Sequence, residues 1–492
     1  MDAHQDTRTA LRSLAVLLGL VLGVATSLRA QTIDTLALRH IARSLADDSL
    51  LGRDTGSEGE RKAARIIVAH LKEIGLSPAD PAGFAIPLPL LRVRLDPSSR
   101  MTVRTARDSA VFLAGRDFVL HSVGRNGLHP MQGPAVYMDD TSRPVAASRL
   151  EGRIIVTTGP MGEQARHAVR TWIQAGVSGV ILPVPSDSQF AAIQPSATRE
   201  RLIVDGAVDE PVWQPDLPVI VAGPALTRAL FVDLTPARDD TAHVLELNRN
   251  VDAQLRFETT PVPSINIAGI VTGKDPALRD EVVILTAHYD HLGVGRPFRG
   301  DSIYNGFSDN AAGVAMLLGI AKALLEDPPD RSVLFLFTSG EERGLLGSAY
   351  WTAKPSVPLD RTVAVLNLDA GAPPAPPVRW RVAGDSLLPA VPIAASVIQR
   401  NGWTADVTPA NANSDHWPFM NRGVPTVFLV PGRDWEGLST DEGAALYAQW
   451  DRYHQPGDEW RPGYPMAGLQ RYAMLALEIT RAFASAEAQL RH

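Results

Sequence analysis

The chain has 492 residues, which is longer than a typical single domain, so two domains are expected. Its 45% hydrophobic and 21% charged residues are ordinary values for a globular protein. The net charge of -7 is small for this length and favours neither nucleic acid nor an anionic membrane as a partner. Because the chain contains no cysteine, disulfides and thiolate metal ligands are excluded. Any metal ion must be held by histidines and carboxylates.

The first thirty residues have the pattern of an export signal. Arg8 and Arg12 precede an apolar run over residues 14–25, and Ala30 offers a small side chain at the expected cleavage point. The apolar run is shorter than the roughly 20 residues that a membrane-spanning helix needs, so cleavage is favoured over a permanent anchor. We therefore predict a signal peptide at residues 1–30 and a secreted or periplasmic protein without stable membrane association.

Two amphipathic helices are predicted next, at residues 34–47 and 60–74, because apolar side chains recur there at helical spacing. Gly75 is a typical residue just beyond a helix end. A glycine-punctuated loop at residues 51–57 separates the helices. We assign residues 31–111 to the N-terminal part of the main domain.

The segment from 112 to 257 changes to short strands and turns. Its clearest elements are strands at 153–157, 179–182 and 217–221 and a helix at 165–175. No group of titratable residues with metal or nucleophile spacing occurs here, and His167 lies on the polar side of its helix. This pattern indicates a satellite domain that does not carry the chemistry.

The chemistry is predicted between residues 280 and 369. Three uninterrupted apolar runs are typical of parallel strands covered on both faces, at residues 281–287, 333–337 and 363–368. Polar groups follow each run: His288 and Asp290, then Glu341 and Glu342, then Asp369. Open α/β sheets bind ligands outside the carboxyl ends of their strands, so these side chains are expected to lie together.

Histidine and carboxylate ligands suit zinc, and two ions about 3.5 to 4 Å apart with a shared carboxylate can drive a hydrolysis. Asp309, at the start of a predicted helix over residues 310–325, is the best candidate for the shared ligand. We assign His288, Asp309 and Asp369 to one ion. The other ion is assigned to Asp309, Glu342 and His454.

Glu341, directly before Glu342, is not assigned to either ion. Neighbouring side chains in an extended or turn backbone point apart, so one carboxylate can bind metal while the other faces the water. We predict that Glu341 is the general base that activates metal-bound water. Asp290, two residues after His288, is predicted to orient that imidazole. Taken singly, residues of these types are usually solvated or structural, but their joint occurrence at strand ends favours a metal centre. No role is assigned to His291.

At these residues the sequence resembles the two-zinc exopeptidases of clan MH, of the bacterial leucyl aminopeptidase and glutamate carboxypeptidase type. The resemblance covers about residues 263–460 and rests on the words AHYDH, SDNAAG, GEERGLLGS, NLD, SDHWPF and YH in this order. It implies a doubly wound α/β/α peptidase sheet, with residues 258–492 as the catalytic domain and two zinc ions per chain. The sequence departs from the common NLDM pattern at Ala370, which bears on the shape of the pocket.

Further expectations follow from the resemblance. Residues 112–257 look like the smaller, β-rich protease-associated domain that is inserted in many such enzymes. Tyr453, directly before the last histidine ligand, matches a tyrosine that stabilises the oxyanion in some relatives. His416 is the second candidate for that role and for lining the substrate pocket. Relatives commonly have a cis peptide after the bridging aspartate, which predicts a cis bond between Asp309 and Asn310.

The predicted function is an exported metallo-aminopeptidase that hydrolyses N-terminal residues from peptides. A carboxypeptidase or dipeptidase is the alternative, and it needs a cation for a free carboxylate; Arg433 and Arg343 are available, but the sequence does not place them in the pocket. Glutaminyl cyclisation on a related fold is a third possibility. A non-catalytic binding protein is expected to have lost ligands or base, and none is missing. The preferred side chain and the oligomeric state are not determined by the sequence.

Overall fold

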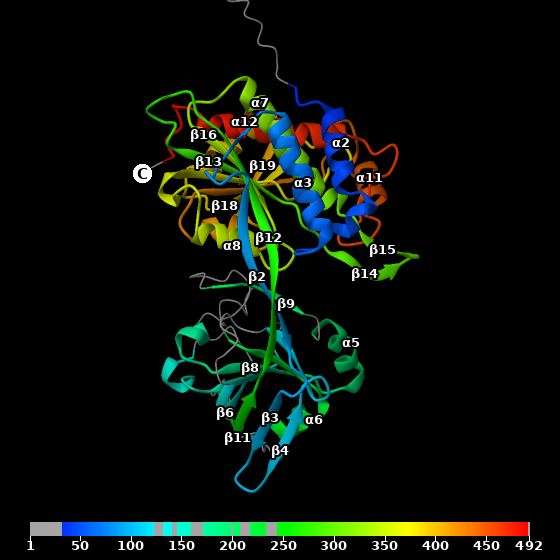
Figure 1. The fold of residues 1–492 in the computed structure, drawn as a ribbon, viewed down its shortest axis with the longest axis vertical. Coiled ribbons are helices and arrows are strands. Elements are labelled where there is room, and N and C mark those ends of the chain that lie inside the picture. The colour runs from blue at the N-terminus through cyan, green and yellow to red at the C-terminus, as the bar shows by residue number, and fades with distance from the viewer. Residues whose placement is uncertain are drawn as a thin grey trace, which may run out of the picture.

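The computed structural model describes residues 32–122, 131–139, 145–158, 171–197, 200–206, 217–232 and 244–490. These residues form two lobes of unequal size, joined by a pair of long strands (Figure 1). The predicted signal peptide and His167 lie outside the described residues.

The large lobe is built on a mixed sheet of ten strands in the order β19-β18-β20-β17-β13-β16-β12-β2-β9, with β1 beside β12. The strands are β1 (Ser77–Pro78), β2 (Ala85–Leu95), β9 (Arg201–Val204), β12 (Phe257–Val271), β13 (Val282–His288), β16 (Ser332–Thr338), β17 (Thr362–Asn367), β18 (Arg379–Gly384), β19 (Thr404–Thr408) and β20 (Thr426–Pro431). A separate hairpin pairs β14 (Gly293–Phe298) with β15 (Asp301–Tyr304).

The centre of this sheet is parallel and buried. Strand β13 pairs in parallel with β16 on one side and β17 on the other, and β17 pairs in parallel with β20. Every residue of β13, β16 and β17 is buried, which is why their sequences are apolar without alternation. The three strands predicted from those runs are confirmed.

Helices cover both faces of the sheet. Alternate residues of β13 point to opposite sides: Val283 and Leu285 join the core under α7 and α12, whereas Ile284 packs in the cluster that contains Trp351 of α8. This arrangement confirms the predicted α/β layering. The helices of the large lobe are α2 (Thr35–Leu45), α3 (Glu58–Glu73), α7 (Ala312–Glu326), α8 (Leu346–Ala353), α9 (Ala390–Arg400), α10 (His416–Met420), α11 (Thr440–Trp450) and α12 (Ala467–Ala484), with short 3₁₀ turns at Asp48–Arg53 and Leu359–Arg361.

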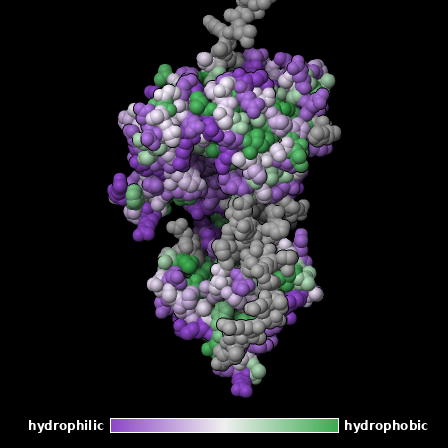
Figure 2. All heavy atoms as spheres, turned by 180° about the vertical axis from the view of Figure 1, so that it is seen from behind, coloured by the Kyte–Doolittle hydropathy of each residue, from purple (hydrophilic) through white to green (hydrophobic). Residues whose placement is uncertain are grey.

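Helix α7 is apolar on nearly all sides because it lies inside the fold. The segment Phe307–Glu326 is long and apolar enough to cross a membrane, but 78% of its most apolar window is buried within the protein. It contacts α2, α12 and strand β13. Its composition is therefore that of a core helix. On the face shown in Figure 2, hydrophilic and hydrophobic residues are interspersed over the described part of the large lobe.

Strands β2 and β12 connect the lobes (Figure 1). They pair antiparallel along eleven positions, from Ala85 opposite Ile267 to Leu95 opposite Phe257. The part of β12 nearest the small lobe is mostly exposed, so it lacks the continuous apolar pattern of the central strands.

The small lobe contains a second sheet in the order β4-β3-β11-β6-β7-β8-β10-β5. Its elements are β3 (Arg100–Arg104), β4 (Ser109–Leu113), β5 (Phe118–Ser122), β6 (Met131–Met138), β7 (Ile154–Thr157), β8 (Gly179–Pro183), β10 (Val219–Ala222), β11 (Val244–Gln254), α5 (Asp187–Ala197), α6 (Pro224–Phe231) and a 3₁₀ turn at Ala147–Arg149.

Two strands do not follow the domain limits expected from the sequence. The limit between residues 111 and 112 falls inside β4, whose partner β3 already belongs to the small lobe. Strand β9, from within the segment 112–257, pairs instead with β2 in the large sheet. The reason is that a local pattern indicates that a strand exists, but the identity of its partner is decided by long-range packing.

Candidate metal centre

The ends of three neighbouring parallel strands carry the polar side chains of the site. His288 is the last residue of β13, Asp369 lies two residues beyond β17, and Glu341 and Glu342 follow β16. Asp309 lies in the turn Phe307–Ala311 that leads into α7, and its own backbone is not helical, with φ -119° and ψ 93°. Because the strands are parallel, their carboxyl ends meet at one edge of the sheet.

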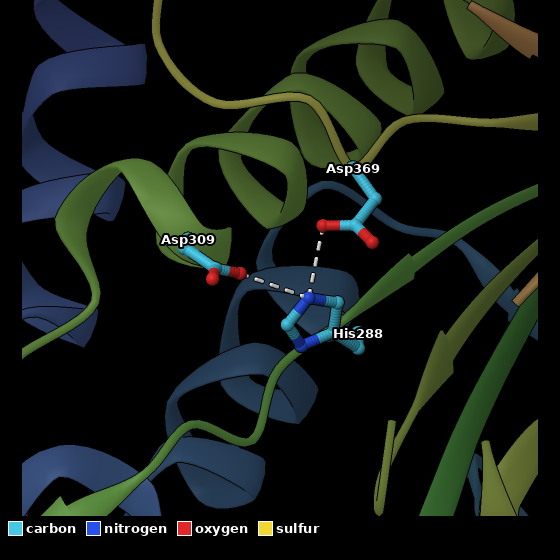
Figure 3. Close-up of side chains that lie close together, drawn as sticks. All are labelled: His288, Asp309 and Asp369. Atoms are coloured by element: carbon cyan, nitrogen blue, oxygen red, sulfur yellow. Dashed lines mark hydrogen bonds and ion pairs between the residues drawn. The ribbon is translucent and has the colours of Figure 1, made fainter. Parts of the chain in front are cut away.

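The first cluster consists of His288, Asp309 and Asp369. The Nε2 atom of His288 lies 2.9 Å from Oδ1 of Asp369 and 3.1 Å from Oδ1 of Asp309. Both carboxylates point at this one nitrogen (Figure 3). The opposite nitrogen, Nδ1, lies 3.1 Å from the backbone carbonyl oxygen of Asp290. A proton on Nδ1 donated to that carbonyl leaves the Nε2 lone pair facing the two carboxylates, which is how a histidine ligand is presented to a metal ion.

The second cluster consists of Asp309, Glu342 and two histidines. Nε2 of His454 lies 3.1 Å from Oδ2 of Asp309 and 3.3 Å from Oε2 of Glu342. Nδ1 of His291 lies 2.7 Å from Oε1 of Glu342 and 3.9 Å from Oδ2 of Asp309. The two oxygens of Asp309 thus face different clusters, as a shared ligand requires. The sequence left His291 without a role, and the structure places its fully buried ring beside Glu342.

Glu341 is partly buried and interacts electrostatically with residues of both clusters, namely His288, Asp369 and Glu342. Burial is the main cause that raises its pKa well above the usual value, and the negative charges of Asp369 and Glu342 add to this effect. Its backbone N–H donates to Oδ1 of Asp290 at 3.3 Å, while Thr55 donates to the other oxygen at 2.8 Å. The Asp290 carboxylate lies 3.7 Å from Nδ1 of His288, farther away than the Asp290 carbonyl oxygen. The carbonyl of Asp290 therefore orients the imidazole, and its carboxylate holds the backbone of Glu341.

The charge of the site fits divalent cations. Burial raises the pKa of Asp369, whereas for Asp309 and Glu342 hydrogen bonds from the histidines outweigh burial and lower the pKa below the usual value. Four carboxylates so close together, one buried and three partly buried, are all ionised only if positive charge lies among them. Imidazole and carboxylate donors in two sets that share Asp309 are the ligands that zinc takes in proteins.

The turn that carries Asp309 is held by groups that the sequence did not reveal. Asp458 accepts the backbone N–H of Ser308 at 2.9 Å and that of Asp309 at 3.1 Å. Gly306 has a φ of +61°, and a Cβ there would come within 2.2 Å of the Asp309 carbonyl oxygen and 2.6 Å of the His291 ring. The peptide bond between Asp309 and Asn310 is cis, which confirms the prediction.

Arg53 is a second residue that holds this turn and that the sequence did not reveal. Its fully buried guanidinium donates to the backbone carbonyl of Tyr289 at 2.8 Å and to that of Gly306 at 3.0 Å. It therefore joins the turn after His288 to the turn before Asp309. Burial lowers its pKa to about 10, so it stays charged at neutral pH beside the carboxylates of the site. The only signal in the sequence was its place in the glycine-punctuated loop.

Glu60 supports the turn that leads to Glu341. Its carboxyl group is buried and accepts hydrogen bonds from Ser264 at 2.5 Å, from the backbone N–H of Gly56 at 2.6 Å and from the Ser339 hydroxyl. Burial is the main cause that raises its pKa from 4.5 to about 7. On the sequence alone, Glu60 is an ordinary acidic residue in the first turn of a helix.

A pocket of about 330 Å³ opens onto the first cluster and the shared Asp309. Tyr453 lines it, stacked on the His454 ring with 3.9 Å between ring centroids, and its side chain is 64% exposed. Desolvation and the nearby carboxylates raise the pKa of its hydroxyl, so the group is a proton donor at neutral pH. The metal-cluster residues that line the pocket are Asp309, Glu341 and Asp369.

His416 does not line the pocket, contrary to expectation. It is fully buried and stacks on Phe428, which does line the pocket, with 4.9 Å between ring centroids. Burial lowers its pKa to about 3, so the ring is neutral and supports the wall from behind. The two arginines considered for binding a substrate carboxylate lie in different places. Arg343 pairs with Asp54, whereas Arg433 lines the pocket.

The fold and this site define a metal-dependent α/β hydrolase, and comparison with known proteins narrows the class. Residues 266–480 match the sequence model of peptidase family M28. This region is therefore a peptidase M28 domain, which confirms the resemblance to the exopeptidases of clan MH.

Individual relatives are aminopeptidases. The chain is 26% identical over 222 residues to "Aminopeptidase YwaD" of Bacillus subtilis (strain 168), covering 43% of each chain. It is 28% identical over 261 residues to "Probable leucine aminopeptidase 2" of Aspergillus fumigatus, covering 50% of this chain and 47% of that protein. The match thus spans less than half the length of these curated relatives.

Among solved structures, an aminopeptidase from Aneurinibacillus sp. strain AM-1 aligns over 94% of this chain and 97% of its own, with a TM-score of 0.53 and 16% identity. At this identity the likeness concerns the fold alone. It extends over nearly the whole chain, and therefore includes both lobes.

Proposed function

We propose that this chain is an exported two-zinc metallo-aminopeptidase that removes N-terminal residues from peptides. The observation that carries the proposal is the sharing of Asp309 between two clusters of histidines and carboxylates, with Glu341 beside them in one pocket. The peptidase M28 domain and the aminopeptidase relatives support it.

The ligands of the proposal are His288, Asp309 and Asp369 for one zinc ion, and Asp309, Glu342 and His454 for the other. His291, 2.7 Å from Glu342, orients that carboxylate. Bound zinc supplies Lewis acidity toward the scissile carbonyl and the attacking water.

Glu341 and Tyr453 perform the proton chemistry. The Glu341 carboxylate accepts a proton from the attacking water and returns it to the leaving amine. The backbone of Glu341 is held by Asp290, so its carboxylate stays aimed into the pocket. The Tyr453 hydroxyl donates to the oxyanion as negative charge develops on the carbonyl oxygen.

Export and the identity of the small lobe complete the proposal. Export rests on the signal-like sequence of residues 1–30, and the small lobe is proposed to be a protease-associated domain. Secretion of the full chain with loss of those thirty residues, observed by mass spectrometry of the mature protein, tests the first point.

The decisive experiment is a panel of aminoacyl, carboxyl-terminal and pyroglutamyl-forming substrates, assayed with zinc and after chelation. We expect hydrolysis of aminoacyl substrates that disappears on thorough removal of metal and returns with zinc. Activity that survives chelation contradicts the proposal. Hydrolysis confined to substrates with a free carboxyl terminus instead supports the carboxypeptidase or dipeptidase alternative. The observation that favours this alternative is the presence in the pocket of Arg433, a cation that could hold the free carboxylate.

A further inference from the structure

Apart from the metal-cluster residues, the lining of the pocket combines aromatic rings with two guanidinium groups. Arg381 lies on β18 and Arg433 on the loop that follows β20, and both line the pocket. The aromatic residues that line it with them are Phe428, Trp435, Tyr447, Trp450, Tyr453 and Tyr464. Positive charge on a pocket wall is a means of holding a substrate anion.

Neighbouring acids do not neutralise these two arginines. Arg379, two residues before Arg381 on the same strand, takes both nearby carboxylates: its Nε lies 2.7 Å from Asp434 and its Nη1 lies 3.1 Å from Asp406. Within the part of the chain that the structure describes, neither Arg381 nor Arg433 forms an ion pair with an acid. Their charge is therefore left for a ligand.

Arg433 is also oriented for recognition. The centre of its guanidinium lies 4.1 Å from the centroid of the Tyr447 ring. This cation–π contact and a side-chain hydrogen bond with Tyr447 hold the guanidinium in place, and its remaining N–H groups can donate to a ligand. Those N–H groups match a carboxylate in a two-point contact.

Asp451 also lines the pocket, and it lies near Arg433, because both side chains hydrogen-bond with that of Tyr447. Its carboxylate accepts the backbone N–H of Tyr453 at 3.2 Å. Among the described residues that line the pocket outside the metal clusters, it is the only acid against the two arginines. Outside the metal clusters, the described lining thus has two positive charges against one negative charge.

We propose that Arg381 and Arg433 form an anion subsite that binds a carboxylate of the peptide substrate while its scissile bond lies at the metal clusters. The carboxylate belongs either to an acidic first side chain or to the carboxyl terminus of a short peptide. This inference rests on the proposed peptidase function and specifies its substrate class.

Two matched substrate pairs distinguish the sources of the carboxylate. Glutamyl and glutaminyl p-nitroanilides differ only in the side-chain charge, and alanyl-alanine and alanyl-alaninamide differ only in the terminal charge. We expect the zinc-loaded enzyme to prefer the charged member of one pair by at least about tenfold in kcat/KM, mostly through KM, since a charge-assisted hydrogen bond contributes roughly that much. The pair that shows the preference identifies the source.

Variants connect the preference to the arginines. Arg433→Gln and Arg381→Gln should remove most of the preference, because each lowers kcat/KM for the charged substrate much more than for its neutral partner. Arg379→Gln is the matched control, because its guanidinium pairs with Asp406 and Asp434 outside the pocket, and it should keep the preference. Equal hydrolysis of both members of both pairs by the wild type overturns the subsite.

A binding measurement separates this inference from the proposed function. Calorimetry with glutarate on the zinc-loaded protein should show binding that Arg433→Gln weakens by at least about tenfold and Arg379→Gln does not. If no peptide is hydrolysed but glutarate binds in this manner, the peptidase proposal fails and the subsite stands. If peptides are hydrolysed and glutarate binding is the same in all variants, the subsite is wrong.

Discussion

The two halves of the candidate metal centre are held by different kinds of structure. The half around His288 and Asp369 is delivered by strands β13 and β17, which lie at the buried centre of the large sheet. The half around His454 depends on a loop after α11, where the His454 side chain is 38% exposed and its backbone has a φ of +54°. A residue other than glycine in this left-handed region is held at a cost by its surroundings.

This difference predicts unequal metal binding. A ligand at the end of a strand paired on both sides has little freedom, so its site is preorganised before any ion arrives. A ligand on an exposed loop must be ordered by binding. We therefore expect the ion beside His288 to bind more tightly than the ion beside His454, with Asp309 coupling the two.

The largest expected effect concerns Glu341, which interacts with residues of both halves. Glu341→Gln should lower kcat by about 10²- to 10⁴-fold, because the amide conserves the shape of the side chain and removes the base. Metal content, measured by mass spectrometry of the intact protein or by atomic emission, should stay at the wild-type value. A variant that binds less metal would instead identify Glu341 as a ligand and reverse its roles with Glu342.

Replacing the shared ligand should affect both halves at once. Asp309→Asn should weaken both ions, since a neutral amide is a poor bridge between two cations. Metal titration should show two weakened sites where the wild type shows two tight ones. Asp327→Asn, which removes only an exposed pairing with Arg481, is the control and should bind metal normally. Unchanged metal content in Asp309→Asn would contradict the bridging role.

Removing one histidine at a time sharpens the comparison. His454→Ala should lose the weaker ion and keep one ion per chain, whereas His288→Ala should disturb the tighter site. Each loss is expected to exceed about 100-fold in the affinity of that ion, because even outer partners of metal ligands contribute about 10- to 100-fold. Competition with a chelator of known affinity measures both constants. Equal affinities of the two ions in the wild type would show that the halves are equally preorganised.

The smallest expected effect concerns Glu60, which supports the turn that leads to Glu341. The Glu60 carboxyl has a pKa near 7 in the folded chain and an ordinary value of 4.5, so the folded state holds its proton more tightly. This contribution to stability is fully present below pH about 4.5 and is lost as the pH rises through about 7, and its size is about 3 kcal/mol. In metal-free protein, urea unfolding from pH 4.5 to 8 should therefore show a steeper loss for the wild type than for Glu60→Gln.

Glu73→Gln provides the control for that measurement. Glu73 lies on the same helix, α3, and its side chain is 76% exposed. The variant should retain the pH dependence of the wild type. If Glu60→Gln showed that same dependence as well, Glu60 would not be the group that titrates.

The sequence by itself determined the strand-end part of this protein. Uninterrupted apolar runs predicted β13, β16 and β17, and the polar groups after each run predicted that His288, Glu341, Glu342 and Asp369 meet. Asp309 was predicted as their shared partner from its place at a helix start. The physical reason is that parallel strands must be buried on both faces and that their ends must lie side by side. Such features are local in the chain, so a local pattern reports them.

Only the tertiary structure decided which distant groups complete the site. Arg53 and Asp458 reach the metal turn from opposite ends of the chain, and the same packing brings Arg381 to the pocket and withdraws His416 behind Phe428. A buried arginine and a solvated one have the same letter in a sequence. Their environments differ because burial, hydrogen-bond partners and neighbouring charge are properties of contacts between segments that no local periodicity records.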